Sequence, residues 1–408
     1  MCKVSRPPTV DSLYANQPSQ VWFTQSYLSK SSREFPENDY LSCPVGVLLL
    51  LTTLLGSGAA RADTGSQIAR TLKLKSPIQN NDLRFVRDEA RSLYRTLYSE
   101  LTSAESYVDS YRTQIVHLSN GIFIRQGYQL QTEFRRSIRD EFHGEEREMD
   151  FNNQSYAAKE INYWVNNLTR GLIPRFFRSP DELPRDSRLV IFNIFTFKES
   201  WAKPFVPYLT VVSDFWVKEG QAIRVPIMST VEMVNYGEFY DKGFTMIQKP
   251  MKNQRFSFVV LLPTERWNLD GPESVLNGQI LLKTLLEETE YTGVSIKLPR
   301  FKLESEQELI RILESMGTID LFRRAQADLS GITTTERLYI NLLKQGTVLK
   351  VDEIGVEAAA ATSAVAVPTS ILNPTAEFHV DQPFVCFVYD SELHIPLIAA
   401  RVSRPIGG

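Results

Sequence analysis

Residues 188–197 read R-L-V-I-F-N-I-F-T-F, so an extended strand here would be apolar on both of its faces. Such a strand needs cover on both sides and belongs in the centre of a sheet. Helical patterns prevail in the first hundred residues, whereas strand patterns prevail between 209 and 262 and near the C-terminus. Helices early and strands late predict an α+β fold.

The local patterns place the main elements. Helices are expected at 17–31, 44–56, 82–101, 156–169 and 306–317, the last ended by a glycine. Strands are expected at 121–126, 188–197, 295–305 and 338–353, followed by a terminal hairpin of P-F-V-C-F-V-Y-D and I-P-L-I-A-A-R-V. No linker or internal repeat divides the chain, so we expect a single domain over residues 1–408.

Composition excludes several classes of function. A net charge of −3 gives no positive field that would recruit nucleic acid. Cys2, Cys43 and Cys386 lie far apart and form neither a disulfide framework nor a metal pattern. No histidine stands in a metal-binding or nucleophile–base motif, so we expect no metal, no cofactor and no enzyme activity. The longest apolar run, 45–60, is too short to span a bilayer.

Residues 355–368, G-V-E-A-A-A-A-T-S-A-V-A-V-P, form a ribbon of small side chains. As a strand, one face would be small and nearly all apolar, with Val356, Ala358, Ala360, Thr362, Ala364 and Ala366. The other face would carry the ribbon's only charge, at Glu357. Such a strand could enter a crowded sheet as far as Pro368, which interrupts pairing. Because alanine favours helices over strands, a short helix or a flexible linker is the alternative.

The energetics of inserting the ribbon are finely balanced. Ordering the backbone costs roughly 1–2 kcal/mol per residue. Each new ladder hydrogen bond returns about 1 kcal/mol, and apolar burial adds to this. Because these contributions nearly cancel, insertion could be spontaneous or held back kinetically.

The segment 353–362, E-I-G-V-E-A-A-A-A-T, resembles the hinge of inhibitory serpins. Further motifs resemble serpin signatures in the expected order: S-C-P-V at 42–45, F-N-I-F-T-F-K-E-S-W at 192–201 with K-P-F at 203–205, A-D-L-S-G-I at 327–332, and P-F-V at 383–385. The occurrence of all these motifs in the same order over most of the chain makes the resemblance to serpins specific. The resemblance implies the serpin fold, with three β-sheets (A, B and C), about nine helices and an exposed reactive-centre loop at about 354–378.

The resemblance also implies a metastable inhibitor of serine proteases. In that mechanism the cleaved loop inserts as a strand of the central sheet and traps the protease as a covalent acyl-enzyme. The implied partner is the target protease, and the inhibitor is expected to be a monomer. The alternative on the same fold is a non-inhibitory carrier, storage or chaperone-like protein. Those often carry bulky, charged or proline residues in the hinge, and we favour inhibition for the hinge found here, Glu353, Gly355, Val356, Glu357, Ala358, Ala359, Ala360, Ala361 and Thr362.

The family's usual spacing from the hinge glutamate places the scissile bond at Thr369–Ser370. The small side chains before it suit an elastase-like pocket. Cleavage at Ile371 or Leu372 would instead suit a chymotrypsin-like pocket, and Val367 is a further alternative. No Lys or Arg occurs between residues 351 and 400, so trypsin-like proteases are disfavoured as targets.

The sequence is compatible with an extracellular or a cytoplasmic location. The N-terminal residues have no apolar core, so no signal peptide is expected. An elastase-like target favours the extracellular space, which would be reached by a leaderless route, and a cytoplasmic location is the alternative. Asn153 and Asn167 begin N-x-S/T tripeptides and are glycosylation acceptors only if the chain is secreted.

Two further groups come from alignment with the family. Residues of the region where the sheet opens are Cys43, Gly46, Asn193, Trp201 and Gln345. Glutamine at 345 replaces the histidine of many serpins, and its amide could bond to that of Asn193 and preserve a polar latch.

A helical stripe of arginines, Arg84, Arg87, Arg91 and Arg95, lies where some serpins bind heparin-like glycosaminoglycans. The alternative is a solvated face with salt bridges to Asp88 and Glu89.

Overall fold

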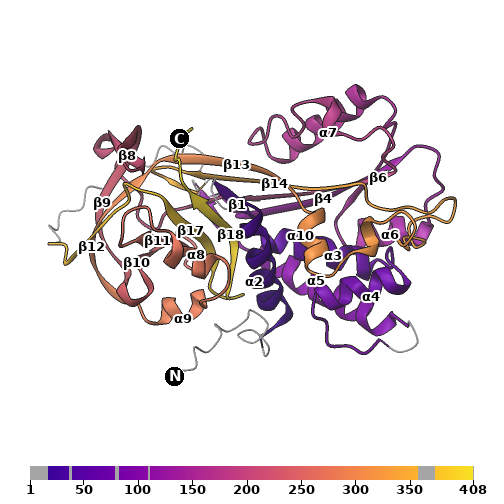
Figure 1. Cartoon of the computed structure of the whole chain (residues 1–408), viewed down its shortest axis with the longest axis horizontal. Helices are drawn as coiled ribbons and strands as arrows, with labels where there is room; N and C mark the ends of the chain where they lie inside the picture. Colours follow the sequence, from indigo (N-terminus) through magenta and orange to yellow (C-terminus); the bar gives the residue numbers. More distant parts are fainter. Residues whose placement is uncertain (1–16, 36–38, 79–81, 109–110, 357–372, 408) are drawn as a thin grey trace, which may run out of the picture.

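The computed structural model describes residues 17–35, 39–78, 82–108, 111–356 and 373–407. The α+β arrangement expected from the sequence is present, with nine α-helices and three sheets in these ranges (Figure 1). The helices are α2 (Ser19–Ser31), α3 (Pro44–Gly56), α4 (Ala62–Thr71), α5 (Arg84–Thr102), α6 (Thr132–Asp140), α7 (Gln154–Leu168), α8 (Asp270–Leu276), α9 (Leu282–Glu287) and α10 (Ile310–Ser315). None of those described is long and apolar enough to cross a membrane.

A seven-stranded sheet runs between α7 on one side and α3, α4 and α5 on the other (Figure 1). Its strands, in spatial order, are β5 (Glu145–Met149), β4 (Val116–Arg125), β6 (Leu189–Phe197), β14 (Leu342–Val351), β15 (Gly355–Val356) and β7 (Glu199–Ser200), while β13 (Phe301–Glu308) pairs with β14. All nine residues of β6 are buried, because helices cover both faces of the strand. The doubly apolar sequence of this strand therefore has the central position that it predicted.

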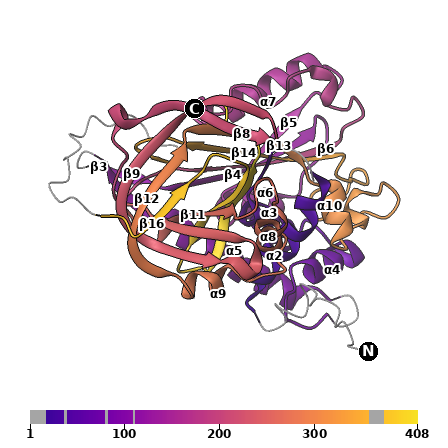
Figure 2. The same ribbon diagram turned by 60° about the vertical axis from the view of Figure 1, so that its left-hand side comes forward.

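A nine-stranded sheet occupies the other half of the molecule (Figure 2). Its order is β1 (Tyr40–Ser42), β18 (Ile395–Val402), β17 (Phe384–Asp390), β11 (Phe256–Pro263), β10 (Phe244–Pro250), β9 (Gln221–Phe239), β12 (Glu290–Pro299) and β16 (Ala376–His379), with β8 (Val211–Lys218) also on β9. The long β9 pairs with β8 at its beginning and with β10 at its end. The third sheet consists of β2 (Glu105–Val108) and β3 (Tyr111–Gln114).

The helix α3 packs against the face of the seven-stranded sheet opposite α7 (Figure 1). It begins at Pro44, since a proline in the first turn lacks only an N–H that would have no helical partner. Every one of its residues is buried, because the helix lies between α5 and β6. A helix buried on all sides fixes the position of the strands above it.

One sequence prediction is wrong in part. The helix expected over 306–317 is confined to α10, and residues 306–308 belong to β13 instead. They pair with Lys344, Gln345 and Gly346 of β14, and Gln307 alone of the three is fully buried. The alternation of burial marks a strand, and pairing with β14 outweighs the helical propensity of glutamate and glutamine.

A buried ion pair joins β9 to β10 next to the seven-stranded sheet. Lys249 contacts the carboxylate of Glu232, and the two side chains are 1% and 5% exposed. Lys249 also donates to the carbonyl oxygen of Lys203 at 3.0 Å and lies over the rings of Trp201 and Phe205. Burial lowers the pKa of Lys249, and Glu232 opposes that shift. The pair thus holds a cation in an aromatic interior.

Replacing Glu232 by Gln should lower the free energy of unfolding by about 3–5 kcal/mol, because it leaves a buried ammonium without its counter-charge. Urea unfolding at neutral pH measures the change. The control is Asp241→Asn, which removes the exposed partner of Lys242 and should cost at most about 1 kcal/mol. Equal effects of the two substitutions would contradict the assigned role of the buried pair.

Candidate functional site

The strands β6 and β14 are direct parallel neighbours over part of their length only. Their pairing runs from Val190–Leu342 to Phe195–Thr347. Beyond that point β15 lies between their continuations, antiparallel to both. Val356 pairs with Val351 of β14 on one side and with Glu199 of β7 on the other. The space between the two central strands is thus occupied at one end and closed along the rest.

The entry to this space fits only a glycine and a small buried side chain. A Cβ atom on Gly355 would lie 2.1 Å from the carbonyl oxygen of Glu199, a distance that no side chain tolerates. Val356 is fully buried. The chain can therefore begin a strand here because residue 355 has no side chain.

The residues just before β15 are held by several hydrogen bonds. Glu353 accepts from Thr210 Oγ1 at 2.7 Å and faces Arg300 at 3.4 Å. Trp201 Nε1 donates to the carbonyl oxygen of Asp352 at 2.8 Å. The side chain of Asp352 in turn accepts the backbone N–H groups of residues 354 and 355. Among the residues expected at the opening region, Trp201 thus lies at the entry, apart from the others.

The other four residues of that region meet in the middle of the sheet. Gln345 Nε2 donates to Asn193 Oδ1 at 2.9 Å, which is the contact expected from the sequence. The same amide bonds to Cys43, the residue before α3, donating to its carbonyl oxygen at 2.8 Å and accepting its N–H at 3.0 Å. A Cβ on Gly46 would lie 2.2 Å from Asn193 Oδ1, so this glycine makes room for the pair. Burial raises the pKa of the Cys43 thiol, which keeps it neutral.

This contact belongs to a longer row of amides. Asn120, Asn193, Gln345 and Gln307 lie directly opposite one another on β4, β6, β14 and β13. Asn193 Nδ2 donates to Asn120 Oδ1 at 2.8 Å. At the other end, Ser42 donates to Gln307 Oε1 at 2.8 Å. The row therefore crosses four strands in the buried interior of the sheet.

Sequence reasoning missed two members of the row, and for different reasons. Gln307 fell in the segment assigned to a helix, so its place opposite Gln345 could not be seen. Asn120 offered a signal, since it is a polar residue directly before the apolar run G-I-F-I. A buried amide in a central strand needs a partner, and this requirement would have pointed to it.

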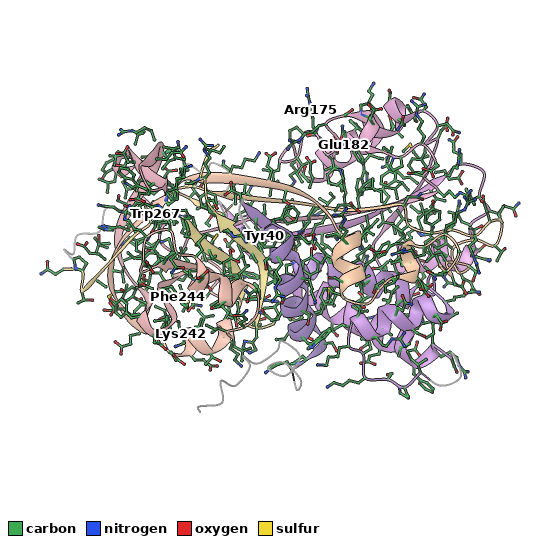
Figure 3. The ribbon with its side chains drawn as sticks, in the orientation of Figure 1. Tyr40, Arg175, Glu182, Lys242, Phe244 and Trp267 are labelled. Carbon is green, nitrogen blue, oxygen red and sulfur yellow. The ribbon has the colours of Figure 1, made fainter. Side chains whose placement is uncertain are left out.

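The segment after α7 is tied to the same sheet. Glu182, in the short 3₁₀ helix η2 (Pro180–Glu182), accepts from Lys344 Nζ of β14 at 2.9 Å. Figure 3 shows Glu182 beside the α7 layer, on the opposite side of the sheet from α3. This link connects a central strand to the layer that covers it.

Two of the four arginines of the stripe pair with carboxylates. On α5, Arg84 pairs with Asp82 at 2.7 Å, and Arg91 pairs with Asp88 and Glu141 at 3.2 and 3.6 Å. The remaining two residues of the stripe are Arg87, whose pKa is lowered by burial and by neighbouring arginines, and the exposed Arg95. The expected salt bridge to Asp88 is present. The one expected to Glu89 is not found in the described part of the chain, because this carboxylate accepts the backbone N–H groups of Lys75 and Ser76 instead.

The two glycosylation candidates lie at the ends of α7. Asn153 is exposed and precedes the helix, and its Oδ1 accepts from the backbone N–H of Tyr156 at 3.1 Å. Asn167 is exposed in the last turn, but Thr169 of its tripeptide is buried. Nothing in this geometry assigns a modification.

Part of the expected site lies outside the described residues. This applies to the hinge residues Glu357, Ala358, Ala359, Ala360, Ala361 and Thr362, and to Val367, Thr369, Ser370, Ile371 and Leu372. The described chain stops in β15 of one sheet and resumes shortly before β16 of the other.

Gln345→Ala should lower the thermal midpoint of unfolding and speed spontaneous conversion to a second folded form in which β6 and β14 have separated. It removes the bonds to Asn193 and Cys43 and leaves buried polar groups unsatisfied, at about 1–3 kcal/mol each. Differential scanning fluorimetry measures the midpoint, and native gel electrophoresis after storage measures the conversion. The matched control is Gln326→Ala at an exposed site. An unchanged midpoint and storage life would refute the latch.

Comparison with known proteins identifies the family to which a chain with this geometry belongs. A model described as serpin (serine protease inhibitor) matches residues 19–405. The solved structure of a serpin from the trematode Schistosoma haematobium is 37% identical with a TM-score of 0.87, covering 95% of this chain and all of that one. Human Serpin B4 is 29% identical over 93% of this chain and 96% of its own. Human leukocyte elastase inhibitor is 27% identical over 85% and 88%. The chain therefore belongs to the serpin family.

Proposed function

We propose that the protein is an inhibitory serpin, a single domain over residues 1–408 whose loop at about 354–378 is the bait for a serine protease. The supporting observation is the partly occupied space between β6 and β14, where β15 already lies in the orientation that an inserted strand would take. Members of the family are mostly protease inhibitors and not enzymes. In the proposed mechanism, cleavage releases the rest of the strand to insert and carry the acylated protease with it.

The register of β15 supports this proposal in detail. Continuing its pairing by one residue at a time would set Val365 opposite Leu342, the first residue of β14. It would set Ala366 opposite Leu189, the first residue of β6. Pro368 would then fall beyond the ends of both strands, where its missing N–H costs no ladder bond. The ribbon therefore has the length that the central strands can pair with.

The same register brings Thr362 to the amide row. It would lie opposite both Gln345 and Asn193, the two residues whose mutual hydrogen bond must break on insertion. A threonine hydroxyl both donates and accepts, so it could bond to the separated amides. The small face that begins with Val356 would point to the side of α3, because its partner Val351 lies six residues from Gln345 on β14 and Gln345 bonds to Cys43 on that side. Insertion would thus replace the latch without leaving buried amides unsatisfied.

The proposed targets are elastase-like or chymotrypsin-like proteases, with the protease bound covalently to a monomeric inhibitor. One relative is named for inhibition of leukocyte elastase, and the small side chains before Thr369–Ser370 fit a shallow specificity pocket. Heparin binding by α5 is the weaker proposal, because Arg84 and Arg91 already pair with carboxylates.

At least one of two proteases tested in parallel, pancreatic elastase and chymotrypsin, should form a complex with the protein that survives denaturing gel electrophoresis. The released C-terminal peptide should begin at Ser370 with elastase. A peptide with another first residue would move the bait bond to Ile371, Leu372 or Val367. Absence of a stable complex with either protease would refute inhibition, and a protease with its catalytic serine replaced by alanine is the control.

Thr362→Arg should turn the inhibitor into a substrate. The bait bond remains intact, so cleavage continues, but a charged side chain facing Gln345 and Asn193 cannot enter the buried interior. We expect the complex band to fall at least tenfold while the cleaved band grows. Asn373→Arg, which adds the same side chain at an exposed site beyond the bond, should keep full complex formation. Continued trapping by Thr362→Arg would contradict the proposed register.

A further inference from the structure

A cavity of about 220 Å³ opens on the α7 face of the seven-stranded sheet, next to the end of α7. Four basic residues line it, His117, Arg170, Lys198 and Lys350, and none of the described lining residues is Asp or Glu. Lys350 keeps a salt bridge to Asp352 at 3.3 Å outside the lining. Burial, together with Arg170, lowers the pKa of His117. Near neutral pH the positive charge of the cavity therefore comes from the other three residues.

The cavity lies where the strand begun by β15 would continue. Val356 is opposite Val351 and Glu199, so the next residue along that strand would be opposite Lys350 and Lys198. Directly opposed residues on neighbouring strands point to the same face, and successive residues alternate between faces. Val356 shares the face of its partner Val351, which is also the face on which Gln345 bonds to Cys43 beside α3. Its successor would therefore point to the α7 face, where Lys198 and Lys350 line the cavity.

We propose that this cavity is a carboxylate receptor for Glu357 of the inserting strand. The inference rests on the proposed inhibitory function. It adds to that function the step in which the ribbon's only charged residue enters the sheet. Glu357 is the only charged residue among residues 356–367, so a charged cavity matches that residue and no other in the ribbon.

The physical need for such a receptor is clear. Moving a carboxylate from water into a sheet covered by α7 is costly unless the charge is paired. Three cations in a partly enclosed cavity would offset the desolvation cost of the Glu357 carboxylate. They lie at the first position after Val356, the last residue that is already paired. Electrostatic complementarity raises association rates, so the cavity should favour continuation of the strand from its first step.

Synthetic peptides provide a test that does not depend on a protease. The probe is a labelled, N-acetylated eleven-residue peptide with the sequence of residues 357–367, carrying either Glu or Gln at its first position, since Val356 of the protein already holds the preceding position. Its addition to the intact protein is followed by native electrophoresis and by the rise in thermal midpoint. The Glu peptide should add about tenfold faster than the Gln peptide at low salt, and high salt should shrink this difference.

Substitutions in the cavity test whether its lysines cause the faster addition of the Glu peptide. In the double variant Lys198→Gln, Lys350→Gln the two peptides should add at the same rate. Lys218→Gln, at an exposed site on β8, should retain the preference for Glu. Equal rates in the unmodified protein, or a preference that survives loss of both lysines, would overturn the proposal.

The full chain separates this proposal from the proposed function. Glu357→Gln should still form the covalent complex with pancreatic elastase, but a severalfold larger share should be cleaved without trapping. If complexes form and the cleaved share is unchanged, the cavity has no role and inhibition stands. If neither peptide adds and no complex forms, strand insertion and the cavity both fail.

Discussion

The contact between β6 and β14 is the constraint on which the proposed function depends. The two strands are parallel, adjacent and covered on both faces, so their ladder closes the centre of the sheet. The ladder meets a row of amides, in which Gln345 bonds to Asn193 and to the backbone of Cys43. Each hydrogen bond contributes about 1 kcal/mol net, but a buried amide left without a partner costs more. The row should therefore add little to the overall stability of the protein. Its main effect should be to oppose partial separation of β6 and β14, which would leave buried amides without partners.

The glutamine at 345 also sets how that barrier responds to solution conditions. Neither amide nitrogen nor amide oxygen titrates in the physiological range. The groups around the row are equally fixed, because burial raises the pKa of Tyr27 and of the Cys43 thiol and keeps both neutral. A histidine at this position would change charge between pH 5 and 8. With glutamine, the hydrogen bonds of the row keep the same partners throughout that range.

The sequence was informative where one segment carries its own constraint. The apolar run 188–197 allowed only a central strand, and Pro44 marked the start of α3. The sequence was uninformative where a property depends on register between distant segments. Gln307 becomes a partner of Gln345 only through the pairing of β13 with β14, and local helical propensity hid this. The basic cavity likewise gathers residues from 117 to 350, whose spacing in the chain gives no sign that they meet.

The two faces of the incoming strand impose opposite demands. Toward α3 the space is closed by Gly46, Asn193 and Gln345, so that face must be small, and the alanines meet the requirement. Toward α7 the first position of the proposed strand would meet Lys198 and Lys350, which line the basic cavity, so a carboxylate would be favoured there over a small neutral side chain. A sequence chosen only for smallness would satisfy one face alone. Under the proposed insertion, glutamate followed by alanines would satisfy both faces, and the ribbon would need a single charge.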